Sequence, residues 1–391
     1  MSPNTDFIPF ARPSLGTEEE EAVIKVLRSG WLTTGTEAKN FETEFAAYTN
    51  SSKALAVNSA TAGLHLALEA LGVGPGDKVI TTPYTFTSTA EVIIYLGADP
   101  VFADIDPDTF NIDPVKIEKL LKKDPSIKGI IPVHIAGNPC NMGALLKLRE
   151  KYNLFIIEDA AHSFPVKYNG KLLGSIGDIG VFSFYATKTI TTGEGGMIVT
   201  NNSKAAKRIS VMRLHGIDRE IWDRYTSDKP SWQYSIVDAG YKYNMPDIAA
   251  AIGREQLKKA SLFLKKRENI AKYYLKNLED MDFLKLPEYV ENHGWHLFMP
   301  RIVPEKLTVN RNDFIKEIIS KGVGISVHFI PLHIMPYYKN KYGYKEDDYP
   351  ETLKVYNTVF SLPIYPDLTE NQLKRIITAV IDTGLKYRRT S

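Results

Sequence analysis

The sequence predicts an α/β protein whose central sheet is mostly parallel. Along residues 54–200, short apolar segments typical of strands alternate with segments whose apolar residues recur at helical spacing. That alternation is the pattern of parallel strands joined by crossover helices. Polar residues directly follow several of the expected strands, and ligands of such sheets bind beyond the carboxyl ends of the strands. A length of 391 residues leaves room for a second, smaller domain.

The expected elements follow one another closely along the first half of the chain. The first helix begins at the capping-box pattern of residues 17–20 (Thr-Glu-Glu-Glu) and stops before Gly30. Strands are expected over residues 54–57, 78–82, 100–104, 129–133, 154–157, 181–184 and 197–199. Helices are expected over residues 64–71, 114–123, 142–151 and 204–212, with another after Thr89.

The pattern changes to long helices from about residue 247, over residues 248–257 and 262–278. Later elements are a strand over residues 295–298 and 301–303, a helix over residues 314–319, and a Thr369-capped helix ending at Thr383. We therefore expect a large α/β domain over residues 1–250, including the N-terminal helix, and a small α+β domain over residues 251–391. The aromatic-rich segment 217–237 is expected to be a long ordered loop.

Composition excludes several classes of protein. The hydrophobic and charged fractions, 43% and 24%, are those of an ordinary soluble globular protein. The 48 basic and 46 acidic residues nearly cancel, so neither a nucleic-acid nor a membrane partner is expected. A single cysteine, Cys140, forms no intrachain disulfide, and with no signal peptide evident it favours a cytoplasmic protein. His328 and His333 lack the spacing of a helical zinc pair, so no metal site is expected.

Lys188 is the residue around which the chemistry is expected to be arranged. It lies between the strands expected at 181–184 and 197–199, and three glycines (Gly193, Gly195 and Gly196) follow it. Asp159 ends another apolar strand. A pyridoxal phosphate enzyme needs such a pair: the lysine holds the aldehyde as a Schiff base, and the acid keeps the pyridine nitrogen protonated. Alone, each residue has a simpler interpretation, as a solvated loop charge and a helix cap.

A phosphate site is indicated at the turn formed by Ser59, Ala60 and Thr61, where a strand gives way to a helix. Small residues there leave backbone N–H groups unpaired at the positive end of the helix dipole. A plain helix N-cap at Ser59 or Thr61 is the alternative. No Walker loop or dinucleotide fingerprint occurs, so a cofactor phosphate is favoured over a nucleoside triphosphate.

Three motifs resemble the sugar aminotransferase family called DegT/DnrJ/EryC1/StrS, which belongs to the fold-type-I pyridoxal phosphate enzymes. They are Glu-Asp-Ala-Ala-His at 158–162, Gly-Asp-Ile-Gly-Val-Phe-Ser at 177–183, and Lys188 followed by Gly-Glu-Gly-Gly at 193–196. The resemblance spans residues 8–383. It implies a large domain with a mainly parallel sheet, a smaller C-terminal α+β domain, and a homodimer with shared active sites.

The resemblance also implies roles for residues around the cofactor. Phe86 would stack on the pyridine ring, and His162 would lie near the ring hydroxyl. Ser183 would reach the phosphate, together with the turn formed by Ser59, Ala60 and Thr61. Thr33 and His328 would contact the substrate.

Lys242 is implied to cross the dimer interface and meet the partner's cofactor phosphate. Lys242 and Asn244 depart from the commoner Gly-Tyr-Asn-Tyr-Arg form of this segment. The departure is similar to that of the subgroup acting at C4 of keto-sugar nucleotides.

The implied reaction is transfer of the amino group of L-glutamate to a keto-sugar nucleotide, through pyridoxamine phosphate, in the synthesis of amino sugars for lipopolysaccharide or surface polysaccharide. The favoured acceptor is a 4-keto-6-deoxyhexose or 4-ketopentose linked to UDP, GDP or dTDP. Amination at C3 is the alternative specificity. A related sugar dehydratase is disfavoured because such enzymes lack the lysine at position 188, and a non-catalytic cofactor-binding relative is disfavoured by the Lys188–Asp159 pair.

Overall fold

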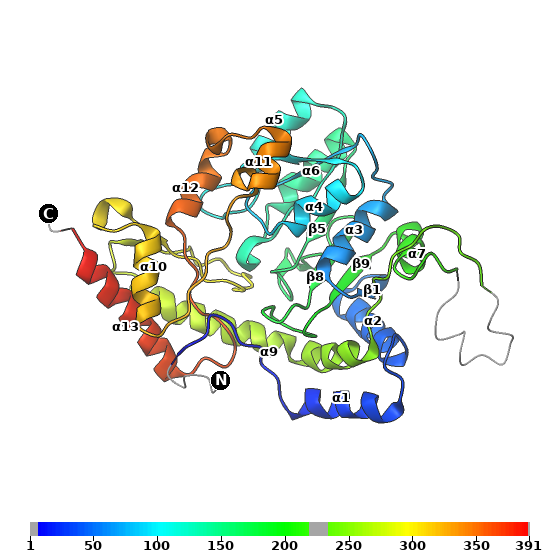
Figure 1. Cartoon of the computed structure of the whole chain (residues 1–391), viewed down its shortest axis with the longest axis horizontal. Helices are drawn as coiled ribbons and strands as arrows, with labels where there is room; N and C mark the ends of the chain where they lie inside the picture. The colour runs from blue at the N-terminus through cyan, green and yellow to red at the C-terminus, as the bar shows by residue number, and fades with distance from the viewer. Residues whose placement is uncertain (1–6, 219–233, 390–391) are drawn as a thin grey trace.

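A seven-stranded sheet forms the centre of the computed structural model, which describes residues 7–218 and 234–389 (Figure 1). Across the sheet, the order is β1 (Lys53–Val57), β9 (Gly196–Thr200), β8 (Ile179–Ser183), β5 (Phe155–Asp159), β4 (Ile127–Ile130), β2 (Lys78–Thr81) and β3 (Asp99–Phe102). The pairs β8–β5, β5–β4, β4–β2 and β2–β3 are parallel. Strand β9 is antiparallel to both neighbours, so β1 runs in the same direction as β8. The prediction of a mostly parallel α/β sheet is confirmed.

Helices cover both faces of this sheet because alternate strand residues are apolar on each side. In β9, Ile198 faces one layer of helices, while Met197 and Val199 face the other. The first layer contains α3 (Ala60–Ala70), α4 (Ser88–Tyr95) and α7 (Ser203–Met212). The second contains α5 (Pro114–Lys123), α6 (Met142–Tyr152), α2 (Thr36–Thr49) and the first half of α9 (Asp247–Leu278). Helix α1 (Thr17–Ser29) lies outside, against α9 (Figure 1).

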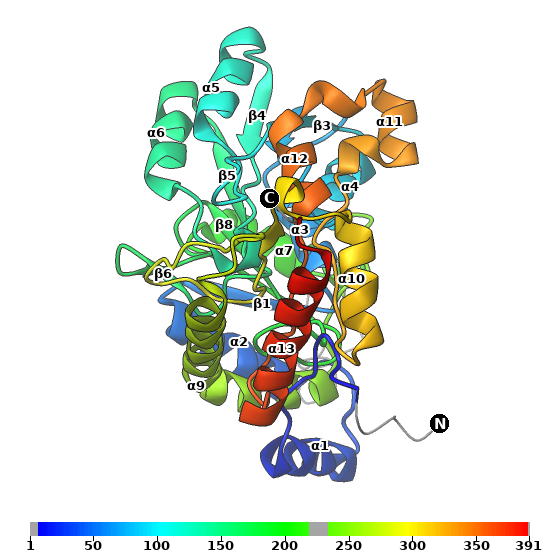
Figure 2. The same ribbon diagram turned by 90° about the vertical axis from the view of Figure 1, so that its left-hand side faces the viewer.

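The C-terminal part of the chain has its own hydrophobic core around the second half of α9. Helix α13 (Glu370–Tyr387) packs between α9 and α10 (Arg311–Ser320) (Figure 2). Helices α11 (Pro336–Tyr342) and α12 (Pro350–Thr358) lie nearer the sheet. The remaining strands form two small antiparallel sheets, β6 (Lys167–Tyr168) with β7 (Lys171–Leu172) and β10 (Leu284–Lys285) with β11 (Arg301–Ile302). No helix among residues 7–218 and 234–389 is long and apolar enough to cross a membrane.

Helix ends agree with several sequence signals and correct one of them. Gly30 ends α1 in the left-handed region, and Asp113 and Thr369 cap α5 and α13 as expected. The capping box of α1 was expected at residues 17–20, which is wrong: the N-cap is Gly16, whose N–H donates to the Glu19 carboxylate at 2.8 Å. The capping interaction starts one residue earlier because the acid that binds the N-cap N–H is Glu19, which also forms an ion pair with Lys259.

Three further expectations are corrected. The two helices expected at 248–257 and 262–278 are one continuous helix, α9, because residues 258–261 contain neither glycine nor proline and Ala260 is buried. Strand β4 ends at Ile130 rather than residue 133, because Pro132 has no N–H to continue the ladder. No strand forms at 295–298, since Trp295 has a φ of 45° and its N–H is bound by His293 Nδ1. The loop expected at 217–237 lies mostly outside the described residues.

Candidate active site

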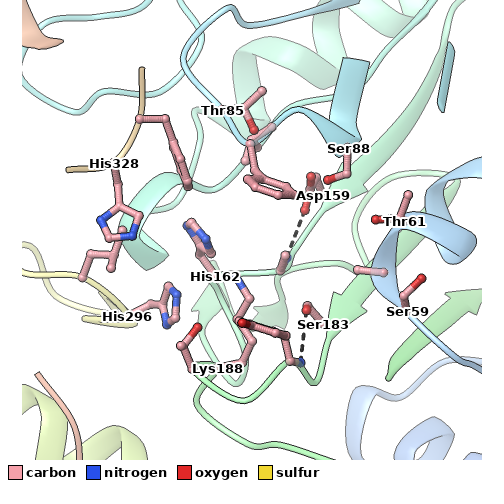
Figure 3. Close-up of a pocket in the computed structure, with 18 of the residues that line it drawn as sticks. Ser59, Thr61, Thr85, Ser88, Asp159, His162, Ser183, Lys188, His296 and His328 are labelled. Carbon is pink, nitrogen blue, oxygen red and sulfur yellow. Dashed lines mark hydrogen bonds between the residues drawn. The ribbon is translucent and has the colours of Figure 1, made fainter. Parts of the chain in front are cut away.

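A cavity of about 600 Å³ opens where the parallel strands end (Figure 3). The ends of β5 and β8, the turn after β1 and the start of β9 all reach this edge of the sheet, because β9 runs opposite to the others. The opposite wall comes from the N-terminal segment and from residues 296–364 of the C-terminal part. The polar residues that line the cavity are Ser59, Thr61, Thr85, Ser88, Asp159, His162, Ser183, Tyr185, Thr187, Lys188, Glu194, His296, Ser326 and His328.

Lys188 projects into the cavity from the loop between β8 and β9 (Figure 3). Its backbone N–H donates to the carbonyl oxygen of Tyr185 at 2.9 Å, which closes a tight turn before the amine. Burial lowers the pKa of the Lys188 amine to about 8. The negative charge of Asp159 opposes this shift, and the positive charge of Arg267 adds to it. Such an amine loses its proton far more readily than an exposed lysine.

Asp159 ends β5 and is buried, with 4% of its surface exposed. Its Oδ2 accepts a hydrogen bond from Thr89 Oγ1 at 2.8 Å, and its Oδ1 accepts one from the N–H of Ala161 at 3.2 Å. Burial raises the pKa of this carboxyl group, while both hydrogen bonds and the charge of Lys188 oppose the rise. The side chain is therefore fixed, and its environment favours a cationic partner.

The turn before α3 carries the features of an anion site. Ser59 is the N-cap, and its hydroxyl accepts from the N–H of Ala62 at 3.1 Å. The first N–H groups of a helix have no intrahelical acceptor, so those of Ala60 and Thr61 remain available. Gly196 packs so closely here that a Cβ would lie 2.8 Å from the nitrogen of Ala60. Ser183, at the end of β8, lines the same part of the cavity.

Phe86, His162 and His328 also line the cavity. Phe86 is 59% exposed, so its ring is accessible from the cavity. The Nδ1 of His162 accepts the N–H of Ala136 at 3.3 Å, so the neutral ring carries its proton on Nε2. Burial lowers its pKa well below the ordinary value. His328 pairs through Nδ1 with Ser361 Oγ at 2.9 Å, and burial lowers its pKa to about 4.

Two of the predicted site residues lie outside this cavity. Thr33 is exposed near the start of α9, where its carbonyl oxygen accepts the N–H of Asp247 at 3.3 Å. Lys242 is exposed beside the end of β1, and its Nζ donates to Asn244 Oδ1 at 2.7 Å. Within one chain, neither residue meets Lys188 or Asp159.

Several residues of the site were not predicted from the sequence. Thr89 was noted only as the start of a helix, and its position three residues after Phe86 was the available signal. His296 and Phe10 had no sequence signal, because both reach the cavity from segments that are far in sequence from Lys188 and Asp159. Phe10 stacks on His328 with ring centroids 5.3 Å apart. No group of three or more His, Cys, Asp or Glu residues in the described part of the chain is placed to hold a metal ion.

Known proteins match this chain over nearly its whole length. The model of the DegT/DnrJ/EryC1/StrS aminotransferase family matches residues 13–381. The spore coat polysaccharide biosynthesis protein SpsC of Bacillus subtilis is 45% identical over 96% of this chain and 97% of its own length.

Solved structures agree with these sequence matches. PseC of Helicobacter pylori, an aminotransferase involved in the biosynthesis of pseudoaminic acid, superposes with a TM-score of 0.91 at 28% identity, over 97% of this chain and 100% of that one. Spr1654 of Streptococcus pneumoniae in its PMP form gives a TM-score of 0.89 at 32% identity, over 97% and 99%.

Proposed function

This chain belongs to the DegT/DnrJ/EryC1/StrS aminotransferase family, and we propose that it transfers the amino group of L-glutamate to C4 of a keto-sugar nucleotide. It is a pyridoxal phosphate-dependent aminotransferase with the fold of that family. The donor, the acceptor and the carbon position are the proposed parts. The favoured acceptors are 4-keto-6-deoxyhexoses and 4-ketopentoses linked to UDP, GDP or dTDP.

The observation that carries the proposal is the presence of Lys188 and Asp159 in one cavity, where the paired strands β5 and β8 end. The residues fit pyridoxal phosphate. A lysine amine with a pKa of about 8 can bind an aldehyde near neutral pH. Asp159, held by Thr89 and Ala161, is placed in our proposal against the ring nitrogen, where its charge would favour the protonated ring.

Other residues of the cavity would hold the two ends of the cofactor. The N–H groups and hydroxyls of the Ser59–Thr61 turn, with Ser183, suit the phosphate because the helix dipole favours an anion there. The exposed face of Phe86 suits stacking on the pyridine ring. The Nε2–H of His162 would donate to the ring hydroxyl.

The bound cofactor supplies an electron sink for the α-carbon of the amino donor. The chain supplies the proton transfers. Once L-glutamate displaces it, Lys188 has a free amine that would carry a proton between the donor's α-carbon and C4′ of the cofactor. Because burial lowers the pKa of that amine to about 8, it can both accept and release a proton near neutral pH.

We propose a homodimer in which Lys242 of one chain meets the cofactor phosphate of its partner. Support comes from the position of Lys242 beside Asn58, the residue just before the phosphate turn. Asn58 Nδ2 donates to the carbonyl oxygen of Lys242 at 3.3 Å. The Lys242 side chain is exposed and does not reach the cavity of its own chain. We propose Thr33 and His328 as substrate contacts.

The choice of C4 rests on the variant segment that contains Lys242 and Asn244, and amination at C3 is the alternative. The loaded enzyme, supplied with L-glutamate, is offered a 4-keto-6-deoxy sugar nucleotide and, in parallel, a 3-keto sugar nucleotide. The position of any new amine is read by nuclear magnetic resonance. Amination of the first compound alone supports the proposal, while amination of the second alone moves the site of transfer to C3.

A further inference from the structure

His296 is a buried imidazole that the cofactor contacts proposed above do not use. It lines the cavity, and 5% of its surface is exposed. Its ring lies against His162, with centroids 4.3 Å apart. Its Nδ1 is buried and has no hydrogen-bond partner within residues 7–218 and 234–389. Buried polar atoms are nearly always paired, and among the described residues with a buried unpaired side-chain atom only His296 lines the cavity, which makes it a candidate ligand contact.

Arg267 lies directly behind His296, on the side away from the cavity. The residue is 3% exposed, and its Nη1 donates to the carbonyl oxygens of Trp295, His296 and Ile364 at 3.4, 3.3 and 2.7 Å. No carboxylate of the described residues forms an ion pair with it, and its Nε is buried without an acceptor. A buried charge is normally paired, because removing it from water is costly. The charge of Arg267 is therefore uncompensated.

The wall of the cavity that contains His296 is close to Lys188 and far from the Ser59–Thr61 turn. Figure 3 shows His296 beside Lys188 and His162, with Ser59 and Thr61 across the cavity. The positive charges of Lys188 and Arg267 both reach His296 and help to hold its pKa down. Among the described residues, the acids that line the cavity are Asp159 and Glu194, which come from the sheet edge rather than from this wall. A negative group bound here would meet a positive field.

We propose that His296, with the charge of Arg267 behind it, binds a carboxylate of the amino donor. This inference rests on the function proposed above. The donor's amino group must reach the position of the Lys188 amine, so its carboxylates extend from that point toward the adjoining wall. A sugar hydroxyl could also accept a hydrogen bond from His296, but it would leave Arg267 without a counter-charge. A carboxylate would accept a hydrogen bond from His296 and would bring a negative charge toward Arg267.

The test measures binding apart from turnover. Glutarate is L-glutamate without its amino group, so it binds without reacting. Its dissociation constant for the cofactor-loaded enzyme is measured by calorimetry for the parent, His296→Ala and His296→Gln. His333→Ala is the matched control, since His333 is also buried with an unpaired Nδ1 but lies outside the cavity.

We expect His296→Ala to bind glutarate about tenfold more weakly. His296→Gln retains an N–H donor and should recover part of this loss, and the His333 variant should bind within about twofold of the parent. If the alanine variant does not fold, the glutamine variant must still bind more weakly than the parent. If the His296 variants bind glutarate as tightly as the parent, the proposed carboxylate subsite is wrong. The same conclusion holds if these variants instead lose affinity for the sugar nucleotide.

A second measurement separates this inference from the proposed function. The 2-oxoglutarate formed from L-glutamate is measured for the parent enzyme. If the parent forms none, yet glutarate affinity depends on His296, then the proposed donor is wrong and the carboxylate subsite stands. If the parent converts L-glutamate and glutarate affinity ignores His296, the donor stands and the subsite is wrong.

Discussion

Thr89 Oγ1 donates a hydrogen bond of 2.8 Å to Asp159 Oδ2, and both side chains are buried. Thr89 lies in the first turn of α4, and Thr85 Oγ1 lies 3.0 Å from its hydroxyl. Helix α4 thereby fixes the orientation of the acid that ends β5. A hydrogen bond to the charged form also opposes the rise in the Asp159 pKa that burial causes.

Replacing Thr89 with valine keeps the shape of the side chain and removes the donor. Hydrogen bonds to charged groups are worth roughly 1.5–3 kcal/mol, so we expect the cofactor dissociation constant to rise by about 10- to 100-fold, with a lower turnover rate. Equilibrium dialysis of the cofactor checks this result. The control is Thr383→Val, which removes a buried hydroxyl in α13 that donates to Ala379, and it should leave cofactor affinity unchanged. Equal losses in the two variants would contradict the role of Thr89.

Glu158, the neighbour of Asp159, organises the loop before β8. Its carboxylate is fully buried and accepts the N–H groups of Gly174, Ile176 and Gly177 at 2.9, 2.7 and 2.6 Å. His134 Nε2 lies 3.1 Å from the same carboxylate. Four polar groups thus depend on one buried side chain.

Glu158→Gln should destabilise the protein by about 3 kcal/mol, because an amide cannot accept all of these bonds and leaves His134 without its charge partner. The free energy of unfolding is measured by denaturant titration. Glu370→Gln removes an exposed acid that pairs with Lys374, so it should change the stability by at most about 0.5 kcal/mol. A Glu158 variant as stable as the parent would show that the loop is held by other contacts.

The pKa of Lys188 predicts how cofactor capture depends on pH. Only the neutral amine attacks the aldehyde, and burial lowers this pKa to about 8. Capture of pyridoxal phosphate by the cofactor-free protein should therefore accelerate as pH rises, with a midpoint near 8 instead of about 10.4 for an unperturbed lysine. Stopped-flow absorbance over a pH series gives the midpoint.

The sign of the coupling with Asp159 provides an internal control. The negative charge of Asp159 raises the Lys188 pKa, so Asp159→Asn should move the midpoint of capture to lower pH. A midpoint near 10 in the parent, or an upward shift in the variant, would contradict this account of the cavity.

Hybrid dimers test the proposed role of Lys242. Lys188→Ala chains lack the amine, and Lys242→Ala chains lack the proposed phosphate contact. If Lys242 acts in the partner's site, a dimer of one chain of each kind contains one complete site, and mixing should restore activity above that of either variant. Activity that never exceeds the sum of the separate variants would place Lys242 outside the partner's site. Lys316→Ala, an exposed lysine on α10, replaces Lys242→Ala in the control mixture.

Much of the fold could be predicted because each signal was local. The alternation of strands and helices set the sheet, and Gly30, Asp113 and Thr369 marked helix ends correctly. The sequence predicts two helices in place of α9 because the apolar pattern weakens near residue 260, although Ala260 belongs to a buried cluster with residues of α2 that no local pattern reveals.

The cavity was predictable where motifs follow strand ends, as at Asp159, Ser183 and Lys188. His296 could not be found in the same way. It reaches the cavity from a segment that turns sharply at Trp295, where φ is 45°, and its neighbour His162 is 134 positions earlier in the chain. Long-range packing of the C-terminal part onto the sheet edge brings these residues together.

The central claim is that Lys188 carries an amino-transfer cycle from L-glutamate to a keto sugar. The most direct measurement follows the visible absorbance of the cofactor joined to Lys188, in the parent and in Lys188→Ala. In the parent, L-glutamate should abolish this absorbance and release about one equivalent of 2-oxoglutarate per chain, and a 4-keto-6-deoxy sugar nucleotide should restore it. The alanine variant should show no turnover. Sustained turnover by Lys188→Ala, or a parent whose absorbance L-glutamate leaves unchanged, would contradict the claim.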